Sequence, residues 1–314
     1  MKLLTKQAFG EIRAWVYRNA RQMELSLWQY EFENGNAEAV LSALSFYQND
    51  DGGFGNALEA DCWNPESSPY TTLSAIGTLS SIDFTDTSRP VMRGILRYLE
   101  SGRHFTGEGW LFSIPSNNDH PRAPWWTYAP KANEFEHTGV TLGIICFILQ
   151  FAEIDSQLYR TALSLAEKLV NKLKAPDNLG DMGVSGYCKL IETLESLNLT
   201  GRFDMGFLTS AVQKLVNAAI VRDASRWSDY CVRPSQFIHS PESPFYAGNE
   251  DIVAEELDYL IDTRPENGVW GITWQWWDNY AKYPKEFAIS ENWWRAVIAI
   301  GELKFLRSFG RLEV

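Results

Sequence analysis

The chain of 314 residues is poor in cysteine and histidine, with four of each. The four cysteines lie far apart, so they form neither a dense disulfide framework nor a Cys-x-x-Cys metal-binding pair. We therefore expect reduced and mostly buried thiols, and no metal ion or organic cofactor. The sequence also lacks a Walker loop, a Gly-x-Gly-x-x-Gly turn and a His-Glu-x-x-His helix, so no motif indicates nucleotide binding or zinc peptidase chemistry.

Basic charge and long apolar runs are equally scarce. The chain carries 28 Lys and Arg against 40 Asp and Glu, a net charge of −12. This balance argues against nucleic acid as a partner, because phosphates require a basic surface. The longest apolar run, Val140 to Phe151, is too short to span a bilayer, and the N-terminal residues carry charges instead of an apolar signal core. These observations predict a cytoplasmic protein without a transmembrane segment.

Helical periodicity dominates the chain, and convincing strand alternation is absent. Ser68 followed by Pro69 is a good helix start, Ser88 and Pro90 repeat the signal, and Ser290 is expected to cap the last helix. No polar linker divides the chain, which predicts one all-α domain over residues 1–314. The predicted helices span residues 36–48, 69–81, 89–101, 137–152, 156–174, 185–198, 205–221, 249–262 and 290–308. Long irregular stretches, expected to line a ligand, span residues 103–134, 223–247 and 264–289.

A glycine-rich turn with an aromatic residue, Gln48 to Gly55, follows the first predicted helix. Weaker copies at residues 107–110, 178–183 and 266–271 follow later helices. A repeated helix–turn–helix unit cannot bury its apolar face alone, so its neighbours must stack, and stacked pairs that curve give a closed α/α barrel. A glutamine side chain can bond free backbone groups at a helix end, which predicts structural roles for Gln48, Phe54 and the turn residues Asp50 and Asp51.

The residues Gln48-Asn49-Asp50-Asp51-Gly52-Gly53-Phe54 resemble the Gln-x-x-x-Gly-x-Trp repeat of squalene and hopene cyclases and of the β subunits of protein prenyltransferases. Gly268-Val269-Trp270 is similar to the second half of that repeat, with Arg264 in the place of the glutamine, and Gly107 to Trp110 is a looser match. Residues 52–61 and 64–69 are similar to uncharacterised bacterial proteins of this repeat class. The resemblance implies an α/α toroid over most of residues 36–308, with inner helices around a central cavity. The Asp-x-Asp-Asp acid of class II terpene cyclases is absent, so the resemblance names no reaction.

Four residues are candidates for acid–base catalysis. Glu59 and Asp61 lie two residues apart in the connection after the turn, where each can shift the pKa of the other. Asp119 and His120 lie in a long irregular stretch, and histidine can shuttle protons near neutral pH. The alternative is that the carboxylates cap helices or pair with arginine, and that the histidine is an ordinary surface residue.

Tryptophan placement predicts the binding surface. Indole faces attract carbocations through cation–π interaction, and they suit the flat apolar faces of sugars equally well. The alternative is that these aromatic residues pack loops over the barrel, and that the histidine among them is a helix cap or a packing residue. The predicted binding residues are Trp63, Trp125, Trp126, His137, Trp276, Trp277, Asp278 and Trp293.

Three functions remain open. The first is an enzyme of the toroid class in which Asp61 or Glu59 protonates an apolar or isoprenoid-like small molecule. The second is a carbohydrate-active α/α barrel, in which Asp61 with Asp119 or Asp278 supplies two carboxyls roughly 5–10 Å apart. The third is a module without catalysis that binds a peptide or a small molecule at the toroid mouth. The expected partner is a small-molecule or glycan ligand in the central cavity. A dry aromatic site with a carboxyl favours the first, and exposed indoles beside facing carboxyls favour the second.

Overall fold

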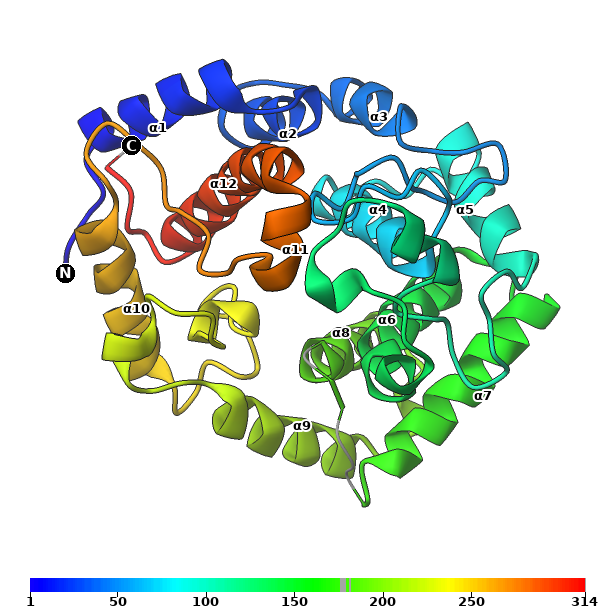
Figure 1. Cartoon of the computed structure of the whole chain (residues 1–314). Coiled ribbons are helices and arrows are strands. Elements are labelled where there is room, and N and C mark those ends of the chain that lie inside the picture. Colours follow the sequence, from blue (N-terminus) through cyan, green and yellow to red (C-terminus); the bar gives the residue numbers. More distant parts are fainter. Residues whose placement is uncertain (176–178, 181, 314) are drawn as a thin grey trace. The chain divides into compact units, whose positions relative to one another are not determined.

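The computed structural model describes residues 1–175, 179, 180 and 182–313, with the backbone alone at residues 132, 134 and 135 (Figure 1). Within this part of the chain the secondary structure is helical, and extended pairing is limited to isolated bridges. The predicted all-α class is therefore confirmed. The chain divides into two compact units, with residues 1–43 and 216–314 in unit 1 and residues 44–215 in unit 2. A single domain and a closed toroid stay predictions.

The α-helices are α1 (Lys6–Asn19), α2 (Gln22–Phe32), α3 (Ala37–Ser45), α4 (Pro69–Ser81), α5 (Pro90–Glu100), α6 (Pro130–Phe151), α7 (Gln157–Lys172), α8 (Gly183–Ser196), α9 (Met205–Ala219), α10 (Glu250–Thr263), α11 (Trp277–Lys282) and α12 (Pro284–Ser308). Five 3₁₀ turns lie between them: η1 (Pro115–Asp119), η2 (Pro124–Trp126), η3 (Thr200–Arg202), η4 (Ala224–Arg226) and η5 (Pro234–Gln236). The boundary between the units falls inside α3 and again inside α9.

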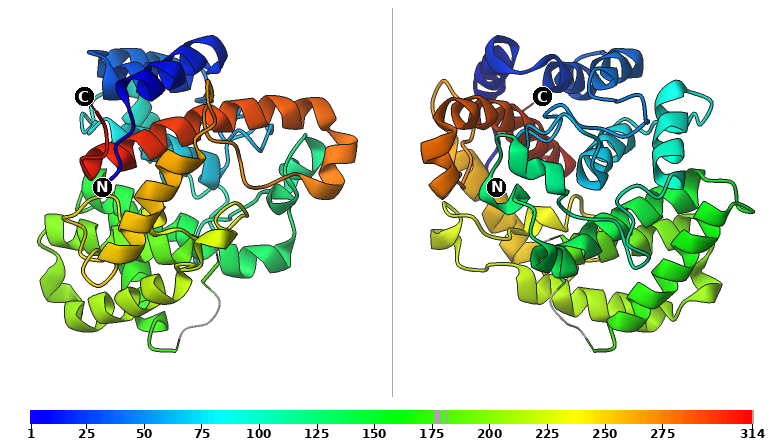
Figure 2. Two further views of the ribbon diagram at one scale, coloured as in Figure 1. Left: turned by 90° about the vertical axis from the view of Figure 1, so that its left-hand side faces the viewer. Right: turned by 45° about the vertical axis from the view of Figure 1, so that its right-hand side comes forward.

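Unit 2 is a layer of three helices with two more helices on one side of it. α6 packs between α4 and α8, and α7 packs on α6; α5 lies on the same side as α7 (Figures 1 and 2). Residues 144–149 of α6 are all buried, as expected for a helix covered on several faces. α7 instead buries one stripe that includes Leu158, Ala162, Leu165 and Leu169, the spacing of a helix with one covered face.

The glycine-rich turn at residues 48–55 packs tightly against α5. The Gln48 side chain donates to the carbonyl of Gly52 at 2.9 Å and to that of Val91 at 3.1 Å. Gly52 has φ +93°, and a Cβ there would stand 2.1 Å from the carbonyl oxygen of Gly94, so both the conformation and the space require glycine. Phe54 is fully buried. These contacts confirm the predicted structural roles of Gln48 and Phe54.

The turn at residues 264–270 in unit 1 repeats this bonding with a different side chain. Arg264 donates to the carbonyl of Gly268 at 3.2 Å, the same four-residue step that Gln48 makes to Gly52. It also pairs with Glu11 of α1 at 2.9 Å, and Trp270 is buried. Arginine therefore fills the position of the repeat glutamine. The predicted copy at residues 178–183 includes residues 178 and 181, which lie outside the described part of the chain.

Unit 1 is formed by segments from both ends of the chain. α12 packs against α1, α2 and α11, and α10 packs against η4 and η5. Leu4 forms a parallel bridge with Leu312, and its amide donates to the carbonyl of Arg311 at 2.8 Å. Neither α1 nor α2 was among the predicted helices. The amphipathic N-terminal pattern indicates them, since α1 buries Ala8, Ile12 and Val16 at four-residue spacing.

Some predicted helix ends were wrong. α12 begins at Pro284, so Ser290 lies fully buried inside the helix and is not its N-cap. Proline at the first helical position overrides the weaker serine signal. The N-cap of α5 is Arg89, while Ser88 bonds the Asp86 side chain at 2.6 Å. α6 likewise begins at Pro130, seven residues before the predicted start, within a stretch predicted to be irregular.

Candidate functional site

Two segments of unit 2 pair beside the predicted carboxylates. Cys62 and Arg122 form an antiparallel bridge. The amide of Trp63 donates to the carbonyl of Pro121 at 2.9 Å, and the amide of Ala123 donates to that of Asp61 at 2.8 Å. Because neighbouring segments share these bonds, residues about 60 positions apart in the chain are held next to each other. We call Glu59, Asp61, Cys62 and Arg122 the acid cluster.

The charged groups of the acid cluster are buried. Glu59 is 5% exposed, Asp61 2% and Arg122 8%. A carboxylate removed from water is costly unless a cation or hydrogen bonds compensate it. Arg122 is oriented by bonds to the carbonyls of Asn118 at 3.1 Å and His120 at 3.0 Å. Its guanidinium therefore stands in a fixed place within the cluster.

The pKa of the Cys62 thiol depends on the charges of the acid cluster. Burial raises the pKa of Cys62 to about 12, and the negative charges of Glu59 and Asp61 add to the rise while Arg122 opposes it. Glu59, Asp61 and Arg122 therefore all lie close enough to act on the Cys62 thiol. A thiol with this pKa stays protonated at neutral pH, so Cys62 is not suited to act as a nucleophile.

An amide network fixes the segment that carries the cluster. Asn64 donates to the side chains of Ser116 at 2.9 Å and Asn117 at 2.8 Å, and Asn117 donates to the carbonyl of Trp126 at 3.1 Å. Asn64 and Asn117 are 3% and 2% exposed. Buried amides satisfied in this way lock one geometry, because each lost bond leaves a polar group without water.

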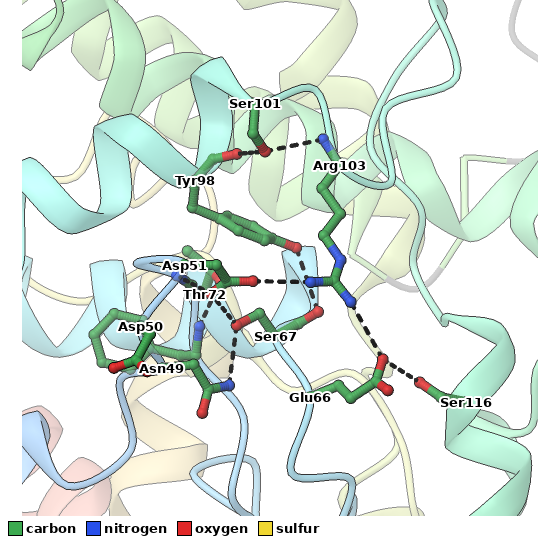
Figure 3. Close-up of polar contacts among 12 residues, drawn as sticks. Asn49, Asp50, Asp51, Glu66, Ser67, Thr72, Tyr98, Ser101, Arg103 and Ser116 are labelled. Atoms are coloured by element: carbon green, nitrogen blue, oxygen red, sulfur yellow. Dashed lines mark hydrogen bonds and ion pairs between the residues drawn. The ribbon is translucent and has the colours of Figure 1, made fainter.

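A second polar network anchors the neighbouring turn (Figure 3). Arg103, which follows α5, pairs with Asp51 at 3.1 Å and with Glu66 at 3.4 Å. Asp51 also accepts from the Ser67 hydroxyl at 2.6 Å, as expected for a turn residue. Glu66 accepts from Ser116 at 3.1 Å, which joins this network to the amides beside the acid cluster. The exposed ion pairs contribute little energy, so we assign them an orienting role.

The backbone between the turn and the acid cluster is strained. Asn56 and Ala57 have φ values of +56° and +58°. Asparagine tolerates the left-handed region, but alanine rarely adopts it. Strained residues persist only where their surroundings hold them, and they gather at functional sites. Here the strain lies two residues before Glu59.

A group of aromatic rings includes Trp126, which follows the Arg122 segment of the acid cluster. Trp126 stacks on Phe112 with ring centroids 4.7 Å apart, and Tyr70 of α4 lies 4.2 Å from the Trp126 ring. Trp126 is 3% exposed, and its buried Nε1 has no hydrogen-bond partner in the structure. A buried indole N–H without an acceptor is uncommon and can be satisfied by an oxygen atom of a ligand or by water.

The other predicted residues of unit 2 lie in less enclosed surroundings. Asp119 ends η1 and is exposed, and His120 is half-buried with its carbonyl bonded to Arg122. Trp63 and Trp125 are half-buried. His137 lies inside α6 with Nδ1 3.5 Å from the Thr141 hydroxyl. Burial lowers the pKa of His137, and Lys172 lowers it further.

The predicted binding residues of unit 1 divide by exposure. Trp276 is fully buried, whereas Trp277 is 59% exposed and Asp278 is exposed. Trp277 begins α11 and is not a loop residue as predicted. Trp293 of α12 is half-buried, with the Arg21 guanidinium 4.6 Å from its ring centroid. Trp276, Trp277, Asp278 and Trp293 therefore belong to a different unit from the acid cluster.

Several residues of the site were missed in the sequence. Arg122 stands between His120 and Trp125 in a segment that was singled out, but no spacing rule pairs it with Cys62. Asn64 lies in a segment that was noted only for its resemblance to a protein family, Asn117 belongs to no motif, and Tyr70 has the pattern of an ordinary helix residue. The pairing of two distant segments is a tertiary contact, so only the fold reveals these four residues.

Comparison with protein-family models, with curated proteins and with solved structures finds no match to this chain. Among the described residues no group of three or more His, Cys, Asp or Glu side chains is arranged to hold a metal ion. In the same part of the chain, no helix combines the length and apolar character that crossing a membrane requires.

Proposed function

We propose that the protein is an enzyme in which the acid cluster protonates an apolar, isoprenoid-like small molecule. The observation that carries this proposal is the burial of Glu59 and Asp61 together beside Arg122. Two carboxyls in one buried place oppose double ionisation, which favours a form in which one of them keeps its proton. A carboxylic acid held in this way can donate a proton at neutral pH.

The aromatic rings support an apolar substrate. Adding a proton to an alkene or an epoxide creates positive charge on carbon, and aromatic faces attract such charge. Tyr70, Phe112 and Trp126 form a group of three contacting rings in the same unit, and Trp126 follows Arg122 by four residues. After the carbocation has rearranged or cyclised, loss of a proton to the carboxylate restores the acid. The net reaction is then an isomerisation or a cyclisation.

The carbohydrate alternative is supported by a different observation. Trp277 and Tyr280 of unit 1 are 59% and 51% exposed and can serve as stacking surfaces for sugar rings. In unit 2, by contrast, Trp126 is buried and Asp119 is exposed while Asp61 is enclosed. This unequal placement of the two carboxyls makes the glycosidase pair Asp61–Asp119 the weaker candidate.

Binding and turnover test the proposal together. A linear isoprenoid that carries a quaternary ammonium group mimics the carbocation, and we expect it to stabilise the protein by about 2.7 kcal/mol at 100 times its Kd. Asp61→Asn is expected to reduce this thermal shift. With linear isoprenoid alkenes and their terminal epoxides as substrates, Asp61→Asn or Glu59→Gln is expected to lower kcat by about 10²- to 10⁴-fold.

Asp119→Asn is the matched control, because Asp119 is a carboxylate of the same unit that is exposed. It should retain the ammonium shift and the turnover. The carbohydrate alternative would be favoured by a thermal shift with soluble oligosaccharides that is lost in Trp277→Ala. In that case the ammonium isoprenoid should cause no thermal shift. The non-catalytic binding module would be favoured if one of these molecules binds, none of them is turned over, and the binding is the same in Asp61→Asn.

A further inference from the structure

Unit 1 contains a buried charge cluster with more acid than base. Glu256 of α10 is fully buried and Glu302 of α12 is 7% exposed. Arg233, the residue before η5, contacts both: its Nε lies 3.3 Å from Glu256 and its Nη2 lies 2.5 Å from Glu302. One guanidinium, on a side chain that is 23% exposed, thus contacts two buried carboxyls.

The cluster fastens an irregular segment to two helices. Ser235 of η5 donates twice to Glu256, from its amide at 2.8 Å and from its hydroxyl at 2.6 Å. Phe237 and Ile238 follow and are buried. Because Glu256 and Glu302 belong to different helices, Arg233 and Ser235 hold residues 233–238 across both α10 and α12.

The charge count of the cluster favours a bound proton. With both carboxyls ionised, the group would carry a net charge of −1, and the two buried acids would repel each other. Burial raises the pKa of Glu256 to about 7 and raises that of Glu302 as well, while Arg233 opposes both rises. Glu256 receives three of the four bonds and Glu302 receives the fourth, so the two carboxyls are linked through Arg233 and its segment. The titration therefore belongs to the pair.

Other titratable groups face the cluster without supplying a second cation. Tyr259 of α10 responds to Arg233 and Glu302, and burial raises its pKa. Arg233 and Glu256 both act on Cys231, and burial raises the pKa of its thiol. The Cys231 thiol therefore carries no charge near neutral pH. Arg226 and Asp229 act on Cys231 with opposite signs. Among the described residues, Arg233 is the cation that contacts both Glu256 and Glu302.

We propose that Arg233, Glu256 and Glu302 form a proton-controlled latch that holds residues 233–238 against α10 and α12. When the shared proton is present, the cluster is neutral and the segment is held. When the proton leaves, two buried carboxylates compete for one guanidinium, and their repulsion loosens the segment. The latch lies in unit 1 and is independent of the acid cluster and of the function proposed for it.

Backbone hydrogen exchange at Ser235 tests the latch directly, because that amide donates to Glu256. After correction for intrinsic exchange, we expect its protection in the wild-type protein to fall by about tenfold from pH 6 to pH 8. Glu302→Gln leaves one carboxylate for one arginine, so its protection should stay constant over this range. Glu255→Gln alters an exposed neighbour on α10 and should show the wild-type fall.

Equal protection at pH 6 and pH 8 in the wild-type protein would overturn the latch. So would a fall of the same size in Glu302→Gln. In a second measurement, carboxyl ¹³C NMR of glutamate-labelled protein should show a glutamate that titrates near pH 7 both in the wild type and in Glu59→Gln, which removes the glutamate of the acid cluster. If every glutamate carboxyl titrates below pH 5, the cluster holds no shared proton and the latch is excluded.

Discussion

At the scale of single residues, two side chains of different chemistry perform one structural task. Gln48 and Arg264 each donate to the carbonyl four residues ahead, to Gly52 at 2.9 Å and to Gly268 at 3.2 Å. Each also reaches a neighbouring helix of its own unit, α5 or α1. The turn requires a long donor at this position, and either an amide or a guanidinium meets the requirement.

Glycine at position 52 is expected to be irreplaceable. Gly52→Ala would place a Cβ 2.1 Å from the Gly94 carbonyl at φ +93°, so we expect a loss of about 2–4 kcal/mol in the free energy of unfolding. Gly77→Ala is the matched control in α4, since nothing lies within 4 Å of its Cβ position. It should gain up to about 1 kcal/mol, because alanine is the better helix former. Chemical denaturation measures both, and equal effects would contradict the contact.

At the scale of helices, a capping side chain or a proline marks the start of several elements. Ser68 accepts from the amide of Thr71 at 3.0 Å, directly before Pro69, which confirms the predicted start of α4. Ser88 lies one residue outside the cap position of α5. Two helix starts that sequence reasoning misplaced, those of α6 and α12, both lie at a proline.

These two serines supply a matched pair for a stability measurement. Ser68→Ala removes the N-cap of α4, and we expect it to cost about 1 kcal/mol of unfolding free energy. Ser88→Ala removes only a surface bond to Asp86 and should change it by less than about 0.5 kcal/mol. Thermal or urea denaturation under one set of conditions compares them. An effect of Ser88→Ala as large as that of Ser68→Ala would contradict the cap assignment.

At the scale of the whole molecule, the chain forms two units, one continuous and one discontinuous in the sequence. Unit 2 is continuous, while unit 1 joins residues 1–43 with residues 216–314. Two contacts connect the N-terminal and C-terminal segments of unit 1. They are the bridge between Leu4 and Leu312 and the packing of α12 on α1 and α2. Contacts over such a separation cost more loop-closure entropy than contacts between neighbouring elements.

The buried acid of unit 1 gives the molecule a predicted pH dependence. Burial raises the folded-state pKa of Glu256 from its ordinary 4.5 to about 7. The folded chain therefore keeps a proton that the unfolded chain releases, so this stabilisation is present below pH 4.5 and is lost as the pH rises through 7. At 1.36 kcal/mol per pKa unit the loss is on the order of 3 kcal/mol.

The comparison of the wild-type protein with Glu256→Gln measures this pH-dependent stabilisation, because the glutamine amide does not titrate. Between pH 5 and pH 7.5 the Tm of the wild-type protein should fall relative to that of the variant. A constant difference over this range would show that Glu256 titrates at its ordinary pKa. Asp223→Asn is a suitable control, since Asp223 is a solvent-exposed group whose pKa is lowered by Ser225.

The sequence by itself determined the helical class, most helix positions and the structural role of the Gln48 turn. These properties are local, since periodicity, caps and glycine requirements act within a few residues of each other. It also pointed to Glu59 and Asp61 through their place after the turn. Only the tertiary structure decided that Arg122 lies beside them, that Trp126 stacks on Phe112, and that Glu256 and Glu302 share Arg233. Each of these joins segments far apart in the chain, and burial and pairing between such segments leave no spacing in the sequence.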